Sequence, residues 1–293
     1  TYLIDASIFI FRAWFSVPDS MTCPKDHPVN AVFGYARFLS DFLESVQPDS
    51  VAAAFDESLS SSFRSELYPP YKANRDPAPA ELKRQFAQCR AVTRLLGVHE
   101  CSDRRYEADD LIGTLAHRGR EAGHCITILS RDKDLLQVLQ VGDAMWDFIG
   151  DKHIGHDDVP DVFGVRADQM VDFLALAGDS VDNIPGVPGV GAKTAGALLR
   201  HFDTLDELYL NLDSVANVNV RGASTLGAKL AAHREQAHLC RELTRIRCDV
   251  PMAGSDLAPV RQEPDLDELN VLYDAAGFGD GLRRQARRIA EAY

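Results

Sequence analysis

Short apolar segments with an aspartate at or just after their end restrict the fold of this chain more than any other feature of its sequence. Residues 2–6 are apolar apart from Asp5, and residues 50–55 lead directly into Asp56. Residues 125–129 form the most strand-like run of the chain. Segments of this length and character are typical of buried strands.

Helical patterns separate these strands. Residues 31–46, 80–96 and 108–121 each carry apolar side chains at intervals of three or four positions. The alternation of strands and helices predicts an α/β fold, in which a mostly parallel sheet is flanked by helices. We therefore expect one α/β core over residues 1–155.

Strand signals fade beyond about residue 155. The later segments that read as helices are 166–177, 191–202, 204–212 and 223–246. Pro251, Pro259 and Pro264 make residues 249–265 read as a linker or a surface wrap, and a short helical tail follows. We expect residues 156–293 to form an α-helical region attached to the core.

Acidic residues gather around the ends of the predicted strands. The carboxyl ends of parallel strands meet at one edge of the sheet, where such sheets bind ligands. The acids of interest are Asp5, Asp56, Glu107, Asp109, Asp110, Asp132, Asp134, Asp179 and Asp182. Those that could instead cap a helix or lie in its first turn are Asp109, Asp110, Asp132 and Asp134. Asp5 and Asp56 have no such explanation, because a charge at the end of an apolar strand needs a partner.

Nine carboxylates in one place would repel one another, because like charges a few ångströms apart raise each other's pKa and destabilise a fold. Divalent cations relieve this repulsion, and carboxylate oxygens suit Mg²⁺ or Mn²⁺. Too few His or Cys residues lie near these acids in the sequence to favour zinc. Two such cations, about 3.5–4 Å apart, are the machinery of phosphodiester hydrolysis: one activates water and the other stabilises the leaving oxygen.

Residues 57–79 form a long connection between the second strand and the helix at 80–96. The segment is rich in Ser and Pro, which fits a solvated loop without fixed structure. It also carries Tyr71, Lys72 and Arg75, which fits a clamp over a phosphate-rich ligand with an aromatic ring for base stacking. Long loops of this kind are often functional. The residues alone leave both interpretations open.

Residues 178–194 form a glycine-rich turn that opens a helix. The spacing of a P-loop is not met, because Ala192 stands where that motif requires Lys. Glycines let a backbone approach a phosphate, and the N-terminus of a helix offers free N–H groups. The turn residues expected to contact phosphate are Gly186, Gly189, Gly191, Lys193 and Thr194. The turn is similar to the helix–hairpin–helix element, which grips a DNA backbone without reading its sequence. A simple tight turn between helices is the alternative.

Six segments together resemble the motifs of the 5′-nuclease family, which contains flap endonucleases and 5′–3′ exonucleases. They are Leu-Ile-Asp-Ala-Ser at 3–7, Ala-Phe-Asp at 54–56, Tyr-Lys-Ala-Asn-Arg at 71–75, Tyr-Glu-Ala-Asp-Asp-Leu-Ile at 106–112, Asp-Lys-Asp-Leu at 132–135 and the glycine-rich turn with Ala195. The chain resembles most the 5′-nuclease domain of bacterial DNA polymerase I and its free-standing relatives, over nearly its whole length. One departure is Ser130-Arg131, where such relatives often carry Gly before the Asp.

The resemblance implies a PIN-like core with a helical arch over about residues 57–90. It also implies a helix–hairpin–helix over about 178–202, within an α-helical DNA-binding region. All nine acids would hold two or more Mg²⁺ or Mn²⁺ ions, and Asp56, Asp132 and Asp134 would take part in catalysis.

The resemblance also implies contacts with DNA. Lys72 and Arg75 would polarise the phosphate that is cut, because negative charge develops there. Tyr71 would stack on a base. The hairpin, with Lys193 and Thr194, would hold the duplex and bind K⁺ on its backbone carbonyls.

The function that the resemblance implies is a structure-selective DNA 5′ nuclease, acting as a 5′–3′ exonuclease, a flap endonuclease or both. Its substrates would be DNA with 5′ ends, flaps or nicks. The alternative is a DNA-structure-binding module of the same fold with weak or no catalysis, against which the full set of acids argues. A smaller RNA-cleaving nuclease of the PIN type would need neither hairpin nor arch. We expect a monomeric, cytoplasmic protein of bacterial type without a membrane segment, since no apolar run approaches about 18 residues.

As an average over the whole chain, the net charge argues against a nucleic-acid partner. The chain has 31 Lys and Arg against 44 Asp and Glu, a formal charge of −13, whereas nucleic-acid binders usually carry a basic excess. However, nine of the acids belong to the expected metal cluster. Residues 63–90 hold six basic against three acidic residues, a local charge of +3. We therefore expect weak DNA binding without divalent ions, because the bare cluster would repel phosphate.

Overall fold

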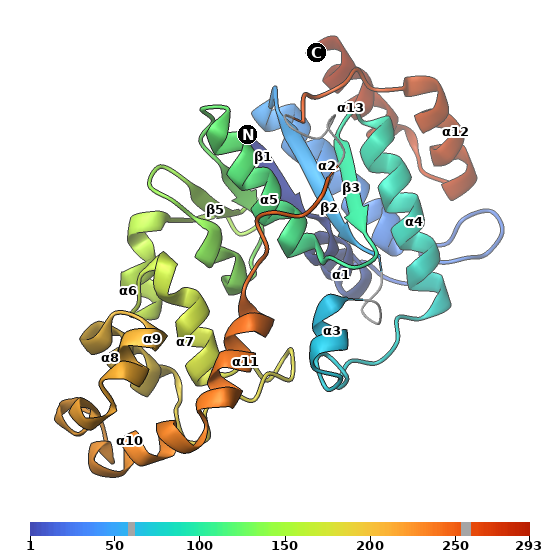
Figure 1. Cartoon of the computed structure of the whole chain (residues 1–293). Coiled ribbons are helices and arrows are strands. Elements are labelled where there is room, and N and C mark those ends of the chain that lie inside the picture. Colours follow the sequence, from blue (N-terminus) through green and yellow to red (C-terminus); the bar gives the residue numbers. More distant parts are fainter. Residues whose placement is uncertain (58–61, 253–258) are drawn as a thin grey trace.

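The computed structural model describes residues 1–57, 62–252 and 259–293, and Figure 1 shows an α/β core with a helical region beside it. Within these residues, six strands form one sheet in the order β3-β2-β1-β4-β5-β6. They are β1 (Tyr2–Asp5), β2 (Val51–Asp56), β3 (His99–Asp103), β4 (Thr127–Leu129), β5 (Ala144–Asp147) and β6 (Lys152–Gly155). β1 to β5 pair in parallel and β6 pairs antiparallel with β5. The predicted α/β fold with a mostly parallel sheet is confirmed.

Helices surround the sheet and make up the second region. They are α1 (Ala6–Ser16), α2 (Asn30–Val46), α3 (Phe63–Leu67), α4 (Ala80–Leu95), α5 (Ala108–Glu121), α6 (Val159–Phe163), α7 (Met170–Ala177), α8 (Ala192–Phe202), α9 (Leu205–Leu210), α10 (Ala223–Ala232), α11 (Arg234–Thr244), α12 (Leu266–Ala276) and α13 (Asp280–Glu291). Short 3₁₀ helices cover Lys133–Val138, His156–Asp158, Ala167–Gln169 and Leu212–Asn217. In the part of the chain that the structure describes, no helix combines the length and the apolar character needed to cross a membrane.

The sheet has a hydrophobic cluster on each face. Successive side chains of a strand point to opposite faces, and in β1 the fully buried Leu3 and Ile4 belong to different clusters. The cluster around Ile4 includes side chains from α1, α2, α4, α12 and α13. The cluster around Leu3 includes side chains from α5, α7, α8 and α11. Covering both faces explains why the central strands β1, β2 and β4 are largely apolar.

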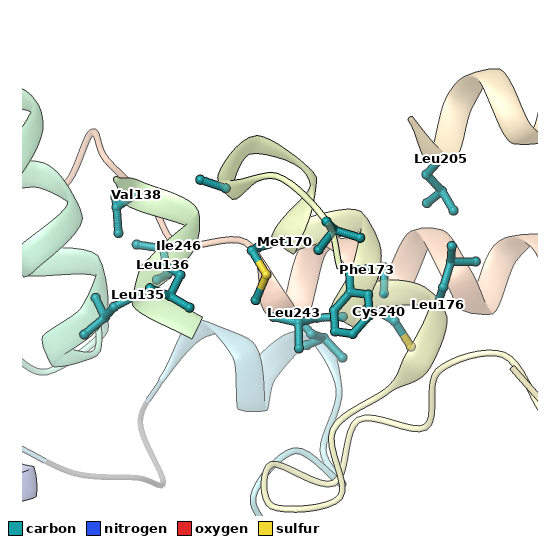
Figure 2. Packing of buried hydrophobic residues seen from close by; sticks show 14 of the residues in the cluster. Leu135, Leu136, Val138, Met170, Phe173, Leu176, Leu205, Cys240, Leu243 and Ile246 are labelled. Atoms are coloured by element: carbon teal, nitrogen blue, oxygen red, sulfur yellow. The ribbon is translucent and has the colours of Figure 1, made fainter. Parts of the chain in front are cut away.

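One continuous core joins the sheet to the helical region. Figure 2 shows Leu136 from the 3₁₀ helix after β4 close to Met170 and Phe173 of α7 and Leu243 of α11. Leu136 and Met170 are fully buried. Because these side chains share one apolar cluster, the helical region is packed against the core rather than tethered to it by a flexible linker.

The C-terminal segment returns to the sheet after α11. The backbone of Arg261 donates a hydrogen bond to Asp49 O (3.0 Å) and that of Gln262 to Gly97 O (2.8 Å). Gly97 has φ +79°, and a Cβ there would lie 1.9 Å from Gln262 O, so only glycine permits this approach. α12 and α13 then pack against α4 and α2. The predicted wrap at 249–265 includes residues 253–258, and the predicted arch includes residues 58–61; both stretches lie outside the described residues.

Several elements differ from the sequence patterns. The strands and helices expected in the α/β core are present, and the structure adds α1, α3, β3, β5 and β6 to them. β3 reads His-Glu-Cys-Ser-Asp and lies at an edge of the sheet, where polar side chains can reach solvent. The helix expected over 223–246 is two helices, because His233 (φ −115°, ψ 22°) leaves the helical conformation.

The packing of α12 predicts a contrast between two apolar residues on one helix. Leu269 is 1% exposed and Val271 is 62% exposed. Leu269→Ala should lower the free energy of unfolding by about 2–5 kcal/mol, because it leaves a cavity in the core. Val271→Ala should change it by less than about 0.5 kcal/mol. Urea denaturation measures both, and equal effects would show that α12 does not pack on the core as described.

Candidate active site

The carboxyl ends of β2, β1 and β4 lie side by side, and an acid is found at or after each. Asp5 and Asp56 are the last residues of β1 and β2. Asp132 caps the 3₁₀ helix that follows β4, and Asp134 lies in its first turn. Asp109 lies in the first turn of α5, which packs against β1 and β2. The parallel sheet therefore gathers acids that are far apart in the sequence at one edge.

Four of these acids have no cationic partner among the residues that the structure describes. Asp5 accepts a hydrogen bond from Ser130 Oγ (3.0 Å). Asp56 accepts hydrogen bonds from Ser7 Oγ and from the backbone N–H of Ala108, both at 2.9 Å. The members of this set, which we call the unpaired acids, are Asp5, Asp56, Asp109 and Asp132. Among the described residues, no Lys, Arg or His nitrogen lies within 4.0 Å of their carboxylate oxygens.

Burial and mutual repulsion make the ionised forms of several acids costly. Burial, followed by the charges of Asp56 and Asp132, raises the pKa of Asp5 to about 7. Burial and the charges of Asp132 and Asp5 raise the pKa of Asp109 well above its usual value. Burial and the charge of Asp132 also raise the pKa of Asp134 to about 7. A cation near these groups would favour their charged forms.

Lys72 and Arg75 neutralise a second part of the site. Lys72 Nζ lies 2.8 Å from Glu107 Oε2 and 3.6 Å from Asp182 Oδ2. Arg75 forms a further ion pair with Asp182. Burial raises the pKa of Glu107, but the charges of Lys72 and of a nearby guanidinium outweigh it and hold the pKa below its ordinary value. The segment around Lys72 thereby fastens the hairpin residue Asp182 to the N-terminus of α5.

Lys133 neutralises two further acids, Asp134 and Asp179. Its ammonium group pairs with Asp179 and lies 3.4 Å from Asp134 Oδ1. Burial raises the pKa of Asp179, but the hydrogen bond and charge of Lys133 outweigh it and lower the pKa. These side chains border an open cleft of about 280 Å³. The cleft is lined by Ile8, Arg75, Arg131, Asp132, Lys133, Asp134, Asp179, Val181 and Asp182.

The donor atoms of the site fit a hard divalent cation, although their present conformations do not form a ready cage. Among the residues that the structure describes, no three His, Cys, Asp or Glu side chains converge on one point closely enough to hold an ion. Several of the carboxylates form ion pairs with basic side chains instead. Within the described part of the chain, however, the buried Glu107 Oε1 and Asp134 Oδ1 make no hydrogen bond. Carboxylate oxygens that lack donors, beside acids of raised pKa, match the preferences of Mg²⁺ and Mn²⁺.

Asp110, which is also predicted to hold metal, lies in a different environment from the other acids. It is fully buried, and its oxygens accept hydrogen bonds from Arg64 Nη1 (2.7 Å) and Nη2 (2.8 Å). The backbone N–H groups of Arg247 (2.8 Å) and Glu107 (3.1 Å) also donate to it. Both oxygens are therefore occupied in this structure, and Asp110 acts as the acceptor of a buried ion pair behind Glu107.

Tyr71 is not placed to stack on a base, which corrects the prediction for its ring. The side chain is only 5% exposed. Its hydroxyl donates to Glu107 Oε2 (3.0 Å) and approaches Asp182 Oδ2 (3.3 Å). The ring packs in the hydrophobic core, so Tyr71 supports two acids from behind and offers no free aromatic face.

The base of the glycine-rich turn is tightly closed. Gly178 and Gly186 have φ +75° and +62°, and a Cβ on Gly186 would lie 2.4 Å from the backbone nitrogen of Gly178. The backbones of Asp179 and Ile184 exchange hydrogen bonds of 2.9 and 2.7 Å. Gly186 is buried, so it shapes the turn and has no surface for phosphate, unlike its prediction. Asp179 lies in this closed base, which positions it at the cleft.

The tip of the turn is open to solvent. Gly189 has φ +80° and is exposed, and Gly191 caps α8. Lys193 is exposed and Thr194 is half-buried in the first turn of α8. A Cβ on Gly191 would meet no atom within 4 Å, so its backbone is accessible to a ligand. The turn thus presents its acids to the cleft and its N–H groups and Lys193 to solvent.

Two residues that the sequence motifs did not single out belong to the site. Lys133 lies between two predicted metal ligands in the sequence, and that adjacency was the available signal. Arg64 gave no local signal, because its partners are distant. Its Nε donates to Leu243 O (2.8 Å) and one Nη to Arg245 O (2.8 Å), in addition to the pair with Asp110. Arg64 thereby ties α3, α5 and the end of α11 together.

Two family models match consecutive parts of the chain. The model described as 5'-3' exonuclease, N-terminal resolvase-like domain, matches residues 1–164, and 5'-3' exonuclease, C-terminal SAM fold, matches residues 165–266. DNA polymerase I of Rhizobium leguminosarum is 38% identical over 270 residues, which are 90% of this chain and 26% of that protein. DNA polymerase I of Pseudomonas aeruginosa is 37% identical over 293 residues, 99% of this chain and 32% of that protein. The chain therefore spans between a quarter and a third of the length of these relatives.

Solved structures share the fold at lower sequence identity. The T5 D15 protein co-crystallized with metal ions superposes with a TM-score of 0.68 and 20% identity, over 99% of this chain and 98% of that chain. The catalytic core of Rad2 in complex with DNA substrate superposes with a TM-score of 0.61 and 15% identity, over 100% and 92% of the two chains. These likenesses extend over both the α/β core and the helical region.

The raised pKa of Asp5 predicts that Asp5→Asn stabilises the protein at pH 8 in EDTA. The folded-state pKa of about 7 exceeds the usual value of 3.8. Between these values the folded state binds the extra proton, so the wild type loses stability as the pH rises toward 7. Asn cannot ionise, so its advantage of about 1–3 kcal/mol should be complete above pH 7 and absent near pH 4.

Urea denaturation in EDTA from pH 4 to pH 8.5 measures the advantage of Asp5→Asn. The matched control is Asp213→Asn at an exposed position, which should change stability by less than about 0.5 kcal/mol throughout. A variant at residue 5 that is no more stable than the wild type at pH 8 would contradict the assigned repulsion.

Proposed function

The chain belongs to the 5′–3′ exonuclease family, and on this premise we propose that it is a structure-selective, metal-dependent DNA 5′ nuclease. The observation that carries the proposal is the edge of the sheet, where the unpaired acids gather and where one of them, Asp132, lines an open cleft together with the ion-paired Asp134, Asp179 and Asp182. A cluster of like charges costs stability, so it persists in a fold only where its charge serves a purpose. Hydrolysis of a phosphodiester by bound cations is the chemistry that uses such a cluster.

The proposed metal ligands are the acids that line the cleft and those that lie at the carboxyl ends of β1 and β2 or at the start of α5. They are Asp5, Asp56, Glu107, Asp109, Asp132, Asp134, Asp179 and Asp182. Two Mg²⁺ or Mn²⁺ ions held there would supply an activated water and neutralise the leaving oxygen. Asp56, Asp132 and Asp134 are placed beside the reacting phosphate in this scheme. Asp110 serves as a positioning residue, because it holds Arg64 and caps the turn that carries Glu107.

Lys72 and Arg75 are the proposed phosphate ligands. Lys72 Nζ stands between Glu107 and Asp182, and Arg75 lines the cleft. A phosphate in the cleft would exchange their carboxylate partners for its own oxygens. Both groups then stabilise charge that grows on the phosphate as the bond breaks. Tyr71 orients Glu107 through its hydroxyl in this scheme.

The proposed DNA contacts outside the cleft lie at the tip of the glycine-rich turn. Gly189, Gly191, Lys193 and Thr194 would hold the backbone of the duplex, with K⁺ on the carbonyl groups of the turn. The N-terminus of α8 favours a phosphate there through its free N–H groups and its dipole. The Rad2 core in complex with DNA substrate supports this by analogy of fold.

The biological setting is proposed from the relatives. The substrates would be DNA with 5′ ends, flaps or nicks, and the protein would act as a monomer in the bacterial cytoplasm. The α/β core with its arch (1–155) would carry catalysis, and residues 156–293 would bind duplex DNA. The two family models meet nearby, at residues 164 and 165.

Cleavage of end-labelled DNA tests the proposed activity. With Mg²⁺, the protein should release 5′-phosphorylated products from flapped and nicked duplexes faster than from single strands, and EDTA should abolish release. Asp132→Ala should lower the cleavage rate by several orders of magnitude and leave binding of the flapped duplex largely intact, because it removes a metal ligand but no DNA contact. Asp213→Ala is the matched control. Full turnover by Asp132→Ala would refute the metal assignment. A wild-type protein that binds DNA but does not cleave it would support the alternative function, a DNA-binding module without catalysis.

The proposed contact of Lys193 with phosphate predicts that removing its charge changes the salt dependence of duplex binding. Lys193→Gln should weaken binding about equally for different sequences and reduce the slope of log K against log salt by roughly 1, since one phosphate contact releases about one counterion. Lys152→Gln, at an exposed position on β6, should leave the slope unchanged. Fluorescence anisotropy with labelled duplex at several salt concentrations gives both slopes. Equal slopes for wild type and Lys193→Gln would remove the hairpin tip from the DNA interface.

A further inference from the structure

Lys133 occupies an unusual position among the acids of the cleft. It lies in the 3₁₀ helix after β4, directly between Asp132 and Asp134. Its ammonium group turns across the cleft to pair with Asp179, which comes from the start of the glycine-rich turn. The same nitrogen lies 3.4 Å from Asp134 Oδ1. One side chain therefore bridges two proposed metal ligands from different regions of the molecule.

The bridge that Lys133 forms is incomplete. Asp134 Oδ1 is buried and makes no hydrogen bond, although the ammonium group is near it. One positive charge also faces two carboxylates, and Asp132 adds a further negative charge beside them. The pair of carboxylates is thus better matched to an ion with two positive charges than to one ammonium group.

Lys133 also has room to leave. Its side chain is 38% exposed and lines the cleft, whereas the side chain of Lys72 is 10% exposed. Lys72 is further enclosed, because its ammonium group lies 5.0 Å from the centre of the Tyr71 ring. The ion pairs of Lys133 are only partly buried, and an ion pair that reaches solvent is worth less than one that is fully enclosed. Of the two lysines, Lys133 is therefore the one that can yield its position at small cost.

We propose that Lys133 is an internal counter-ion of Asp134 and Asp179 that a divalent cation displaces from the cleft. This inference rests on the proposed function, in which both acids bind metal. Binding at this end of the cleft must break two ion pairs, so Lys133 lowers the affinity for metal there. The displaced ammonium group remains attached at the rim of the cleft, where it can pair with a phosphate of DNA. The residue would thus couple metal binding to the arrival of substrate charge.

Binding of Mn²⁺ without DNA tests the proposal. Lys133→Met keeps the length of the side chain and removes its charge. Free Mn²⁺, counted by electron paramagnetic resonance at constant ionic strength, should show roughly five- to tenfold tighter binding to this variant than to the wild type. Lys133→Arg should bind like the wild type, because it keeps the competing charge. Lys152→Met, at an exposed position that does not line the cleft, is the matched control and should also bind like the wild type.

The outcomes separate this inference from the proposed function. A wild-type protein that binds no Mn²⁺ would refute the metal site itself. A wild-type protein that binds Mn²⁺, with equal or weaker binding by Lys133→Met, would overturn the role of Lys133 and leave the proposed function standing. Weaker binding in particular would show that Lys133 holds the two acids together for the metal instead of competing with it.

A second measurement uses the unaltered chain and therefore does not depend on how a variant folds. An acylating reagent modifies lysines in proportion to their free, accessible amine, and mass spectrometry reads each site. Saturating Mn²⁺ should raise the acylation rate of Lys133 several-fold relative to EDTA, because the ammonium group loses its carboxylate partners. The rate at Lys152 should stay constant. An unchanged or slower rate at Lys133 with bound Mn²⁺ would overturn the proposal.

Discussion

Repulsion among the carboxylates at the carboxyl edge of the sheet is the constraint on which the rest of this structure depends. Parallel pairing of β1 with β2 and β4 places Asp5 beside Asp56 and the acids that follow β4. Hydroxyl and N–H groups donate hydrogen bonds to some of these acids, and basic side chains form ion pairs with others. Lys72 and Lys133 form ion pairs with Asp182 and Asp179 of the glycine-rich turn. The same charges that crowd the edge therefore help to hold the helical region in place.

The part of the site that could be predicted from the sequence is the part that the strand order dictates. Asp5 and Asp56 stand at the ends of apolar strands, and a parallel sheet must bring such residues together. The pattern could not show that Asp110 turns toward Arg64, because that pair is 46 residues apart and depends on how α3 docks. Nor could it show that Tyr71 is buried. An aromatic residue in a basic segment has the same sequence pattern whether its ring packs inward or faces a base.

The fold shows the same division between local and distant causes. Apolar strands and amphipathic helices were predictable, because their periodicity is local. β3 and β6 were not, because edge strands carry polar side chains and exist only through pairing with a neighbour. The break at His233 likewise lies inside a continuous helical pattern. We attribute the break to the tertiary packing of α10 and α11, which overrides the local preference for one continuous helix.

The negative charge of the chain has a different meaning once the acids are placed. A formal charge of −13 describes the average, while four unpaired acids and four ion-paired acids gather at the carboxyl edge of the sheet, and four of the eight line the cleft there. The exposed Lys193 lies outside that cleft, at the N-terminus of α8. A strand of DNA that is held by the turn would thus meet the acids only where cations bridge them. In the proposed function, the surface that binds DNA therefore needs positive charge, whereas the site that cuts it needs negative charge to hold metal.

Anomalous diffraction from crystals grown with Mn²⁺ tests the central claim of this account most directly. The account predicts anomalous peaks at the carboxyl edge of the sheet, bonded to Asp132 and to other unpaired acids. With the Mn²⁺ concentration raised, a further peak should lie beside Asp134 and Asp179, with Lys133 turned away. Anomalous density that is absent from this edge, or confined to surface carboxylates elsewhere, would contradict the account.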